Sequence, residues 1–271
     1  MVRSLYTAAT GMRAQQANVD NISNNLSNVN TVGYKTQKTE FKSLLYQTIQ
    51  TRTTSANGAQ KPISAQVGLG TRIASNTSIF TQGVLTATES TSDFAIDGNG
   101  FFALRGADGE TYYTRSGNFH WALGTGGVML TNSDGCPVLN REGNPIVLPE
   151  GVTSASAVIN ERGEIGYTTA EGGFVSLNQT MGIYQFNNPG GLEKQGGTWF
   201  AVTEASGPAL NEATAVGLVP SKIIQGYLEG SNVQVADEMV NLIVAQRAYQ
   251  LNSKAITTSD EMLEQANNLR R

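Results

Sequence analysis

The residue types needed for common catalytic and metal sites are scarce in this sequence. His120 is the single histidine and Cys136 the single cysteine, so a zinc site with several His or Cys ligands and an intramolecular disulfide are both excluded. A Ser-His-Asp arrangement would have to use His120, and the adjacent Trp121 favours a surface position in a strand or turn instead. Cys136 follows an Asp-Gly pair, and we interpret it as a small residue at the start of a strand.

Three carboxylates could recruit calcium or act as a glycosidase pair, namely Asp93, Asp97 and Asp108. They lie near glycines, and aspartate is favoured in turns because its side chain caps the local backbone. We therefore interpret them as turn residues. Gly68-Leu69-Gly70 lacks the further glycine and the strand-to-helix context of a nucleotide-binding loop, and we expect a bend there. The sequence thus predicts no enzyme, no metal and no cofactor.

Length and charge restrict the function further. With 271 residues the chain is long enough for one large domain or two to three small ones, and 39% of its residues are hydrophobic. The net charge of -4 does not support nucleic-acid binding. No stretch approaches the about 18 consecutive apolar residues of a membrane span. Polar residues such as Thr10 and Arg13 interrupt the apolar core that a signal peptide would need.

The first 30 residues predict an amphipathic helix. A spacing of alternately three and four residues is typical of a coiled-coil seam. The seam positions are Leu5, Ala8, Met12, Gln15, Val19, Ile22, Leu26 and Val29. Between Ser4 and Val32 the only charged residues are Arg13 and Asp20. We expect the helix to end near 28–33, where Asn and Gly tolerate the left-handed conformation that closes a helix.

The C-terminal region repeats this pattern. Its seam positions are Val235, Met239, Leu242, Gln246, Tyr249, Ser253, Ile256 and Leu263. Ser231-Asn232 is a helix start signal. We expect the two terminal helices to pair, and their uncharged outer faces to contact helices of further copies. Two helices that pack inside one globular domain would show the same seam, and this alternative stays open.

The segment after the first helix contains Phe41, Leu44, Leu45 and Ile49 at amphipathic spacing, which predicts about two further helical turns. Residues 50–66 are rich in Thr, Ser, Asn and Gly and show no period, so we expect a linker or an extended arm.

The middle of the chain predicts β structure. Apolar runs at 94–96, 101–104, 128–130 and 146–148 are separated by turn pairs such as Asp97-Gly98 and Asp108-Gly109. The expected fold class is α+β, with terminal helices forming a coiled-coil-like stem around a mainly β central body. The expected regions are 1–33 with 231–271 as the stem, 34–93 with 216–230 as an arm and linking β region, and 94–215 as the central β domain.

Three segments resemble the signatures of the bacterial flagellar axial proteins, which include rod, hook and hook-associated proteins. The N-terminal segment, residues 23–35, carries Asn24, Asn25, Asn28, Asn30, Gly33 and Tyr34. The central segments, 97–102 and 113–119, carry Gly98, Gly100 and Phe101. The C-terminal segments within 229–256 carry Gly230, Asn232, Gln246, Arg247 and Asn252.

This resemblance implies a structural subunit of the basal-body rod that polymerises helically into a rigid hollow shaft and transmits torque from motor to hook. The chain length and residues 44–49 are most similar to distal rod proteins; a proximal rod subunit is the alternative. The terminal helices would form the inner tube, and an arm at 46–70 would lock neighbouring subunits.

The implied partners are copies of the same chain, other rod proteins, the hook protein, the outer ring (bushing) proteins and the flagellar type III export apparatus. Export without a cleaved signal peptide would place the subunit in the periplasmic part of the basal body. A β domain that binds the cell wall, with helices serving only as a dimer stalk, is the alternative from another class.

Overall fold

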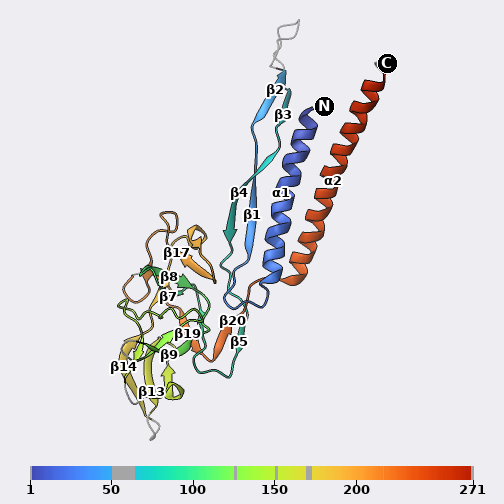
Figure 1. Ribbon diagram of the computed structural model, residues 1–271. Coiled ribbons are helices and arrows are strands. Elements are labelled where there is room, and N and C mark those ends of the chain that lie inside the picture. Colours follow the sequence, from blue (N-terminus) through green and yellow to red (C-terminus); the bar gives the residue numbers. More distant parts are fainter. Residues whose placement is uncertain are drawn as a thin grey trace. The chain divides into compact units, whose positions relative to one another are not determined.

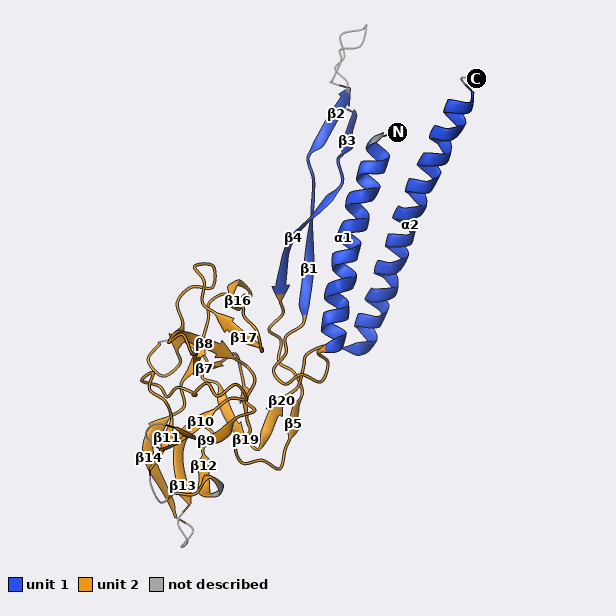
Figure 2. Cartoon of the chain, viewed as in Figure 1, with its two compact units in different colours: residues 1–27, 37–77, 234–271 blue, residues 28–36, 78–233 orange. Residues whose placement is uncertain are grey.

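The computed structural model describes residues 2–50, 65–124, 127–149, 152–168, 173–215 and 217–269. It has a long helix at each terminus and a mainly β middle, which confirms the α+β prediction (Figure 1). The chain divides into two compact units (Figure 2). We call residues 1–27, 37–77 and 234–271 the helical unit, and residues 28–36 and 78–233 the β unit.

The helical unit contains helices α1 (Val2–Ser27) and α2 (Val235–Asn268). The two helices run antiparallel side by side, because Ser4 contacts Ser259 near one end and Gly11 contacts Asn252 further along (Figure 1). Ser4 Oγ and Ser259 Oγ are 3.3 Å apart. A Cβ atom at Gly11 would lie 2.8 Å from Asn252 Nδ2, so glycine permits this close approach.

The ends of the helices largely follow the sequence signals. Helix α1 ends at Ser27, and Gly33 in the following turn has a φ of 68°, as expected for left-handed backbone. Helix α2 begins at Val235, three residues after Asn232, because the Asn232 side chain binds other segments and does not cap the helix.

A two-stranded antiparallel ribbon lies in the same unit as α1 and α2. It is built from β1 (Gln37–Ser43) with β4 (Thr71–Ser78), and β2 (Tyr46–Gln50) with β3 (Ala65–Gly68). Bonds from Leu44 N to Gly70 O and from Leu69 N to Leu45 O connect the two pairs. The predicted helical turns over 41–49 are therefore wrong.

The physical reason is that a partner strand from 65–78 satisfies the backbone of 37–50 across its length, which outweighs the weak helical spacing of four apolar residues. Most of the predicted arm at 50–66 lies outside the described residues. The ribbon is also hydrogen-bonded to α1. Asn21 Nδ2 donates to Thr39 Oγ1 and Asn25 Nδ2 donates to Gln37 O, each at 2.8 Å.

The β unit holds the remaining strands, and its main sheet has the order β16-β17-β8-β7-β15-β18. Their bounds are β5 (Leu85–Ala87), β6 (Phe94–Asp97), β7 (Phe101–Arg105), β8 (Thr111–Thr114), β9 (His120–Gly124), β10 (Gly127–Thr131), β11 (Val147–Leu148), β12 (Ala157–Ile159), β13 (Glu164–Thr168), β14 (Phe174–Thr180), β15 (Ile183–Gln185), β16 (Glu193–Lys194), β17 (Trp199–Ala201), β18 (Leu210–Asn211), β19 (Lys222–Gln225) and β20 (Tyr227–Glu229).

The four predicted apolar runs coincide with β6, β7, β10 and β11, with β11 shorter than expected. Adjacent residues of β7 serve two different cores. Phe102 and Leu104 belong to a cluster with Phe94, Phe119 and Ile165, whereas Phe101 and Ala103 belong to another cluster with Tyr113, Phe186 and Phe200. This alternation is the period-2 pattern of a strand buried on both faces.

Candidate assembly site

The predicted α1 seam is only partly buried. Ala8 and Ile22 are buried, while Leu5, Met12, Val19 and Leu26 are half-buried. Val29 lies beyond the end of α1, so it is not a helix position.

The predicted α2 seam needs a correction. Leu242, Ile256 and Leu263 are half-buried, as a seam position requires, but Met239 is 52% exposed and Tyr249 41% exposed. The buried positions of α2 are instead Glu238, Ala245 and Ser259. Ala245 and Ser259 are small and let the helices approach closely, whereas several larger apolar residues lie on the outer face.

This outer face of α2 is apolar without being covered. Four aliphatic side chains on it are more than half exposed, namely Val240, Ile243, Val244 and Leu251. Between 239 and 259 only Arg247 and Lys254 carry charge. An exposed apolar face of this kind is typical of a protein interaction surface.

The β unit contains a buried charge cluster, formed by Lys35, Arg115 and Glu229. Lys35 Nζ lies 2.6 Å from Glu229 Oε1, and Arg115 Nη1 lies 3.4 Å from Glu229 Oε2, with all three side chains at most 1% exposed. The same Oε1 accepts a bond from Gly83 N at 2.8 Å. The carboxylate of Glu229 thus joins three segments that are far apart in sequence.

Burial lowers the pKa of Lys35, and the Glu229 carboxylate acts in the opposite direction. Burial likewise lowers the pKa of Arg115, opposed by Glu229 and Glu212. Arg115 also donates from Nη2 to Gly98 O at 2.6 Å, and its guanidinium carbon lies 5.2 Å from the centre of the Phe101 ring. Its Nε has no hydrogen-bond partner among the described residues. Sequence reasoning missed this cluster, because nothing in the local patterns indicates which distant charges meet.

Beside the cluster, Asn232 joins three segments of the β unit. Its Oδ1 accepts bonds from Thr36 N and Thr36 Oγ1, both at 2.7 Å. Its Nδ2 donates to Ile79 O at 2.8 Å and to Thr81 Oγ1 at 2.9 Å. All three segments adjoin positions at which the chain passes between the units, after residues 36, 77 and 233. We call Lys35, Arg115, Glu229 and Asn232 the junction network.

Several signature residues lie in or next to the junction network. Gly33 N donates to Glu229 O at 2.8 Å, and Gly230 N donates to Val84 O at 2.8 Å. Tyr34 is buried, with Lys194 Nζ 4.3 Å from its ring centre. Gly100 N donates to Ser221 Oγ at 3.0 Å.

Other signature residues belong to the helices and the turn after α1. Asn25 is buried against the ribbon and Asn252 is half-buried against Gly11, whereas Asn28 is half-buried in the turn. The exposed members are Asn24, Asn30, Gln246 and Arg247.

The residues considered for chemistry are not assembled into a reactive site. His120 is exposed at the start of β9, and Asp97 and Asp108 are exposed. Cys136 is buried, and desolvation raises the pKa of its thiol. The described residues contain no group of His, Cys, Asp and Glu side chains suited to a metal ion. In the same part of the chain, no helix combines the length and hydropathy needed to cross a lipid bilayer.

We expect the helix pair to be more stable at mildly acidic than at neutral pH because of Glu238. Burial raises the pKa of this carboxyl, with a hydrogen bond from Asn25 acting against the shift, and its Oε2 has no partner among the described residues. The folded state therefore favours the protonated form. The contribution of Glu238 to the folding stability is therefore greatest below the pKa that this carboxyl has in the unfolded chain. It is lost as the pH rises through the higher pKa of the folded state.

Glu238→Gln should remove this pH dependence and slow hydrogen exchange of the α1 and α2 amides at neutral pH. The exposed Glu261 of the same helix provides the matched control, Glu261→Gln. An unchanged pH profile in Glu238→Gln would contradict the assignment.

Comparison with known proteins identifies the same three regions as the sequence signatures. Residues 5–35 match the family model for the flagella basal body rod protein, 95–167 that for the flagellar hook protein FlgE/F/G D1 domain, and 224–269 that for the flagellar basal body rod FlgEFG protein C-terminal region.

Full-length relatives agree with these matches. The flagellar basal-body rod protein FlgG of Borreliella burgdorferi is 43% identical over 279 residues, and FlgG of Bacillus subtilis is 40% identical over 273 residues, with 100% of both chains covered in each case. The flagellar hook-basal body complex protein FlhP of Bacillus subtilis is 31% identical over 277 residues, again with 100% of both chains covered. These similarities confirm the resemblance inferred from the signatures, and the chain belongs to the flagellar basal-body rod protein family.

Proposed function

We propose that this chain is the distal rod subunit, which assembles helically into a rigid hollow shaft that transmits torque to the hook. The proposal is supported by identities of 43% and 40% to FlgG proteins, compared with 31% to FlhP. The structural role in the rod follows from family membership, and the distal position, the tube and the torque are the proposed parts.

The main support for assembly into a tube is the exposed apolar face of α2. Val240, Ile243, Val244 and Leu251 lie 56–69% exposed in the single chain, and water contact of such side chains is unfavourable. Because the face extends along a long helix, neighbouring helices of other copies can cover it. A contact of this heterologous kind, repeated by rotation and translation, produces a filament.

In this proposal residues 1–33 with 231–271 form the coiled-coil-like stem that lines the tube, and 94–215 form an outer β domain. Residues 34–93 with 216–230 form the arm and linking β region. The ribbon adds a second contact, since Leu45, Tyr46 and Ile49 are 83%, 63% and 60% exposed. The seam residues Met239 and Tyr249, exposed in the single chain, would contact other copies.

The proposed partners are further rod proteins, the hook protein, the outer ring proteins and the flagellar type III export apparatus. The proposed location is the periplasmic part of the basal body, reached without cleavage of a signal peptide. A purely structural role, without catalysis, fits a family whose members form a rod.

Val244→Asp should abolish tube formation while leaving the single chain folded, because Val244 is 61% exposed. Electron microscopy of concentrated full-length protein would show straight tubes for the wild type and none for Val244→Asp or for a chain lacking residues 1–33. Asn144→Asp adds the same charge at an exposed polar position of the β unit, away from this face, and should assemble normally. Normal tubes from Val244→Asp would contradict the proposed role of this face.

A further inference from the structure

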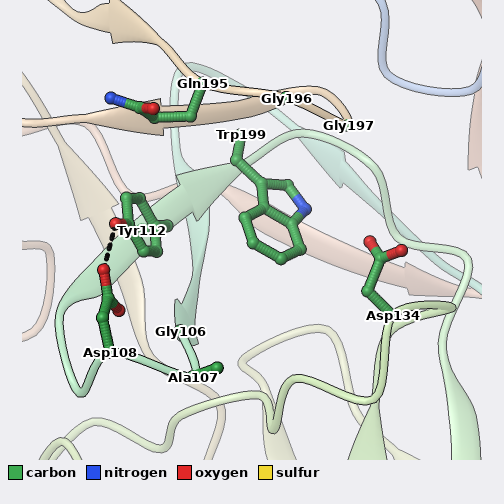
Figure 3. Close-up of a pocket in the computed structure, with 9 residues that line it drawn as sticks. All are labelled: Gly106, Ala107, Asp108, Tyr112, Asp134, Gln195, Gly196, Gly197 and Trp199. Carbon is green, nitrogen blue, oxygen red and sulfur yellow. Dashed lines mark hydrogen bonds between the residues drawn. The ribbon is translucent and has the colours of Figure 1, made fainter.

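The β unit has an open hollow with an aromatic wall and two carboxylates, which we call the acidic hollow (Figure 3). Its volume is about 490 Å³, and its side chains include Asp108, Tyr112, Asp134 and Trp199. The rings of Tyr112 and Trp199 have centres 5.7 Å apart and are tilted by 31°. No Lys or Arg is among the lining residues, so the carboxylates are not neutralised there.

Both carboxylates are placed to attract a cation. Tyr112 donates its hydroxyl hydrogen to Asp108 Oδ2 at 2.6 Å, and this bond lowers the pKa of the Asp108 carboxyl, which therefore stays ionised. The second carboxylate, that of Asp134, has open space beside it at Gly197. A Cβ atom added to Gly197 would lie 3.7 Å from both Asp134 Oδ2 and Trp199 Nε1. A group in this space contacts a carboxylate and an indole together.

A guanidinium group can contact a carboxylate and an indole at the same time. It is planar, always charged, stacks on aromatic rings and forms charge-assisted bonds to carboxylates. Trp is the most favourable of the aromatic side chains for such stacking.

One arginine of the β unit is exposed, and its guanidinium has no partner among the described residues. Among the described residues, the Arg162 guanidinium makes no hydrogen bond, ion pair or ring contact, and the residue is exposed. The other cations of the unit all have partners there: Lys35, Arg105, Arg115, Arg141, Lys194 and Lys222.

Arg162 and Asp134 occupy the same position in two turns of the same type. In one turn Asn160 Oδ1 accepts from Arg162 N, and in the other Asn132 Oδ1 accepts from Asp134 N, both at 3.0 Å. Each is followed by a glycine with positive φ, at 163 and 135. Both side chains thus project from rigid exposed turns, which reduces the entropy lost on contact.

We propose that Arg162 of one copy inserts into the acidic hollow of a neighbouring copy, stacking on Trp199 and pairing with Asp134. The inference rests on the proposed polymeric function. Since the two partners are different surfaces of the same chain, the contact is heterologous and can repeat from copy to copy. It would join β units independently of the terminal helices.

Charge exchange tests this contact. Sedimentation equilibrium of the full-length chain at low salt, up to millimolar concentration, should show self-association that weakens at least about tenfold in Asp134→Arg and in Arg162→Glu. The double variant carries both changes, so every contact is again between opposite charges, and it should recover most of the wild-type association. A general loss of folding would not be repaired in this way.

A third turn supplies the matched control, because Asn140 Oδ1 accepts from Glu142 N at 2.9 Å and Glu142 is exposed like Asp134. Glu142→Arg should therefore leave association unchanged. Equal association of all variants, absence of recovery in the double variant, or a wild type that stays monomeric would each overturn the contact. Tubes that form normally in Asp134→Arg would also overturn the contact, but they would leave the proposed tube intact.

Discussion

Glu229→Ala should destabilise the β unit by about 3–5 kcal/mol, the usual cost of removing one partner from a buried ion pair. The substitution leaves the Lys35 ammonium and the Arg115 guanidinium buried, with side chains at most 1% exposed. It also removes the acceptor of Gly83 N. Lys35 retains Thr81 O at 2.8 Å and Arg115 retains Gly98 O, but neither acceptor carries a charge.

Urea unfolding followed by tryptophan fluorescence measures this effect, because both tryptophans, Trp121 and Trp199, belong to the β unit. The exposed pair of Lys222 with Glu161, at 3.2 Å, is the matched control. Glu161→Ala should cost less than about 1 kcal/mol, since solvent screens exposed pairs. Equal costs for the two variants would contradict the role assigned to burial. Glu229→Gln, which keeps the shape and one acceptor oxygen, should fall between them.

Gly33→Ala should destabilise the β unit almost as much as Glu229→Ala, because the added methyl group has no room. Gly33 has a φ of 68°, and an added Cβ atom would collide with Ser116 N and lie 2.7 Å from the carbonyl carbon of Arg115. The left-handed conformation costs about 1–2 kcal/mol for alanine, and overpacking adds about 1–3 kcal/mol or more. The obstacle is backbone, so no side-chain rotation relieves it.

Gly109→Ala separates the cost of the left-handed conformation from the cost of overpacking. Gly109 has a φ of 84°, but nothing lies within 4 Å of an added Cβ atom. This variant should therefore lose only the conformational cost in the same urea experiment. If Gly33→Ala lost no more than Gly109→Ala, the close approach to the Arg115–Ser116 backbone would have no energetic weight.

The sequence predicts those parts of the fold that depend on local signals. Turn glycines such as Gly98, Gly109 and Gly135 adopt positive φ, and the apolar runs between the turns form strands. The terminal helices are likewise local, since their periodicity extends over many turns.

The sequence does not predict features that depend on distant partners. Residues 37–50 become strands because 65–78 lie opposite them. Met239 and Tyr249 fit the periodic seam, but Ala245 and Ser259 are buried instead, because small side chains let the helices approach closely. The junction network also unites charges almost two hundred positions apart, as in the pair Lys35–Glu229 with a separation of 194.

The way the chain passes between the units affects what a protease can do to it. The backbone crosses from one unit to the other after residues 27, 36, 77 and 233. A single cut after residue 77 produces two fragments, and each still contains parts of both units. The fragments therefore remain associated through two folded interiors at once, and the nicked protein behaves as a complex of complementary pieces that separates only when it unfolds.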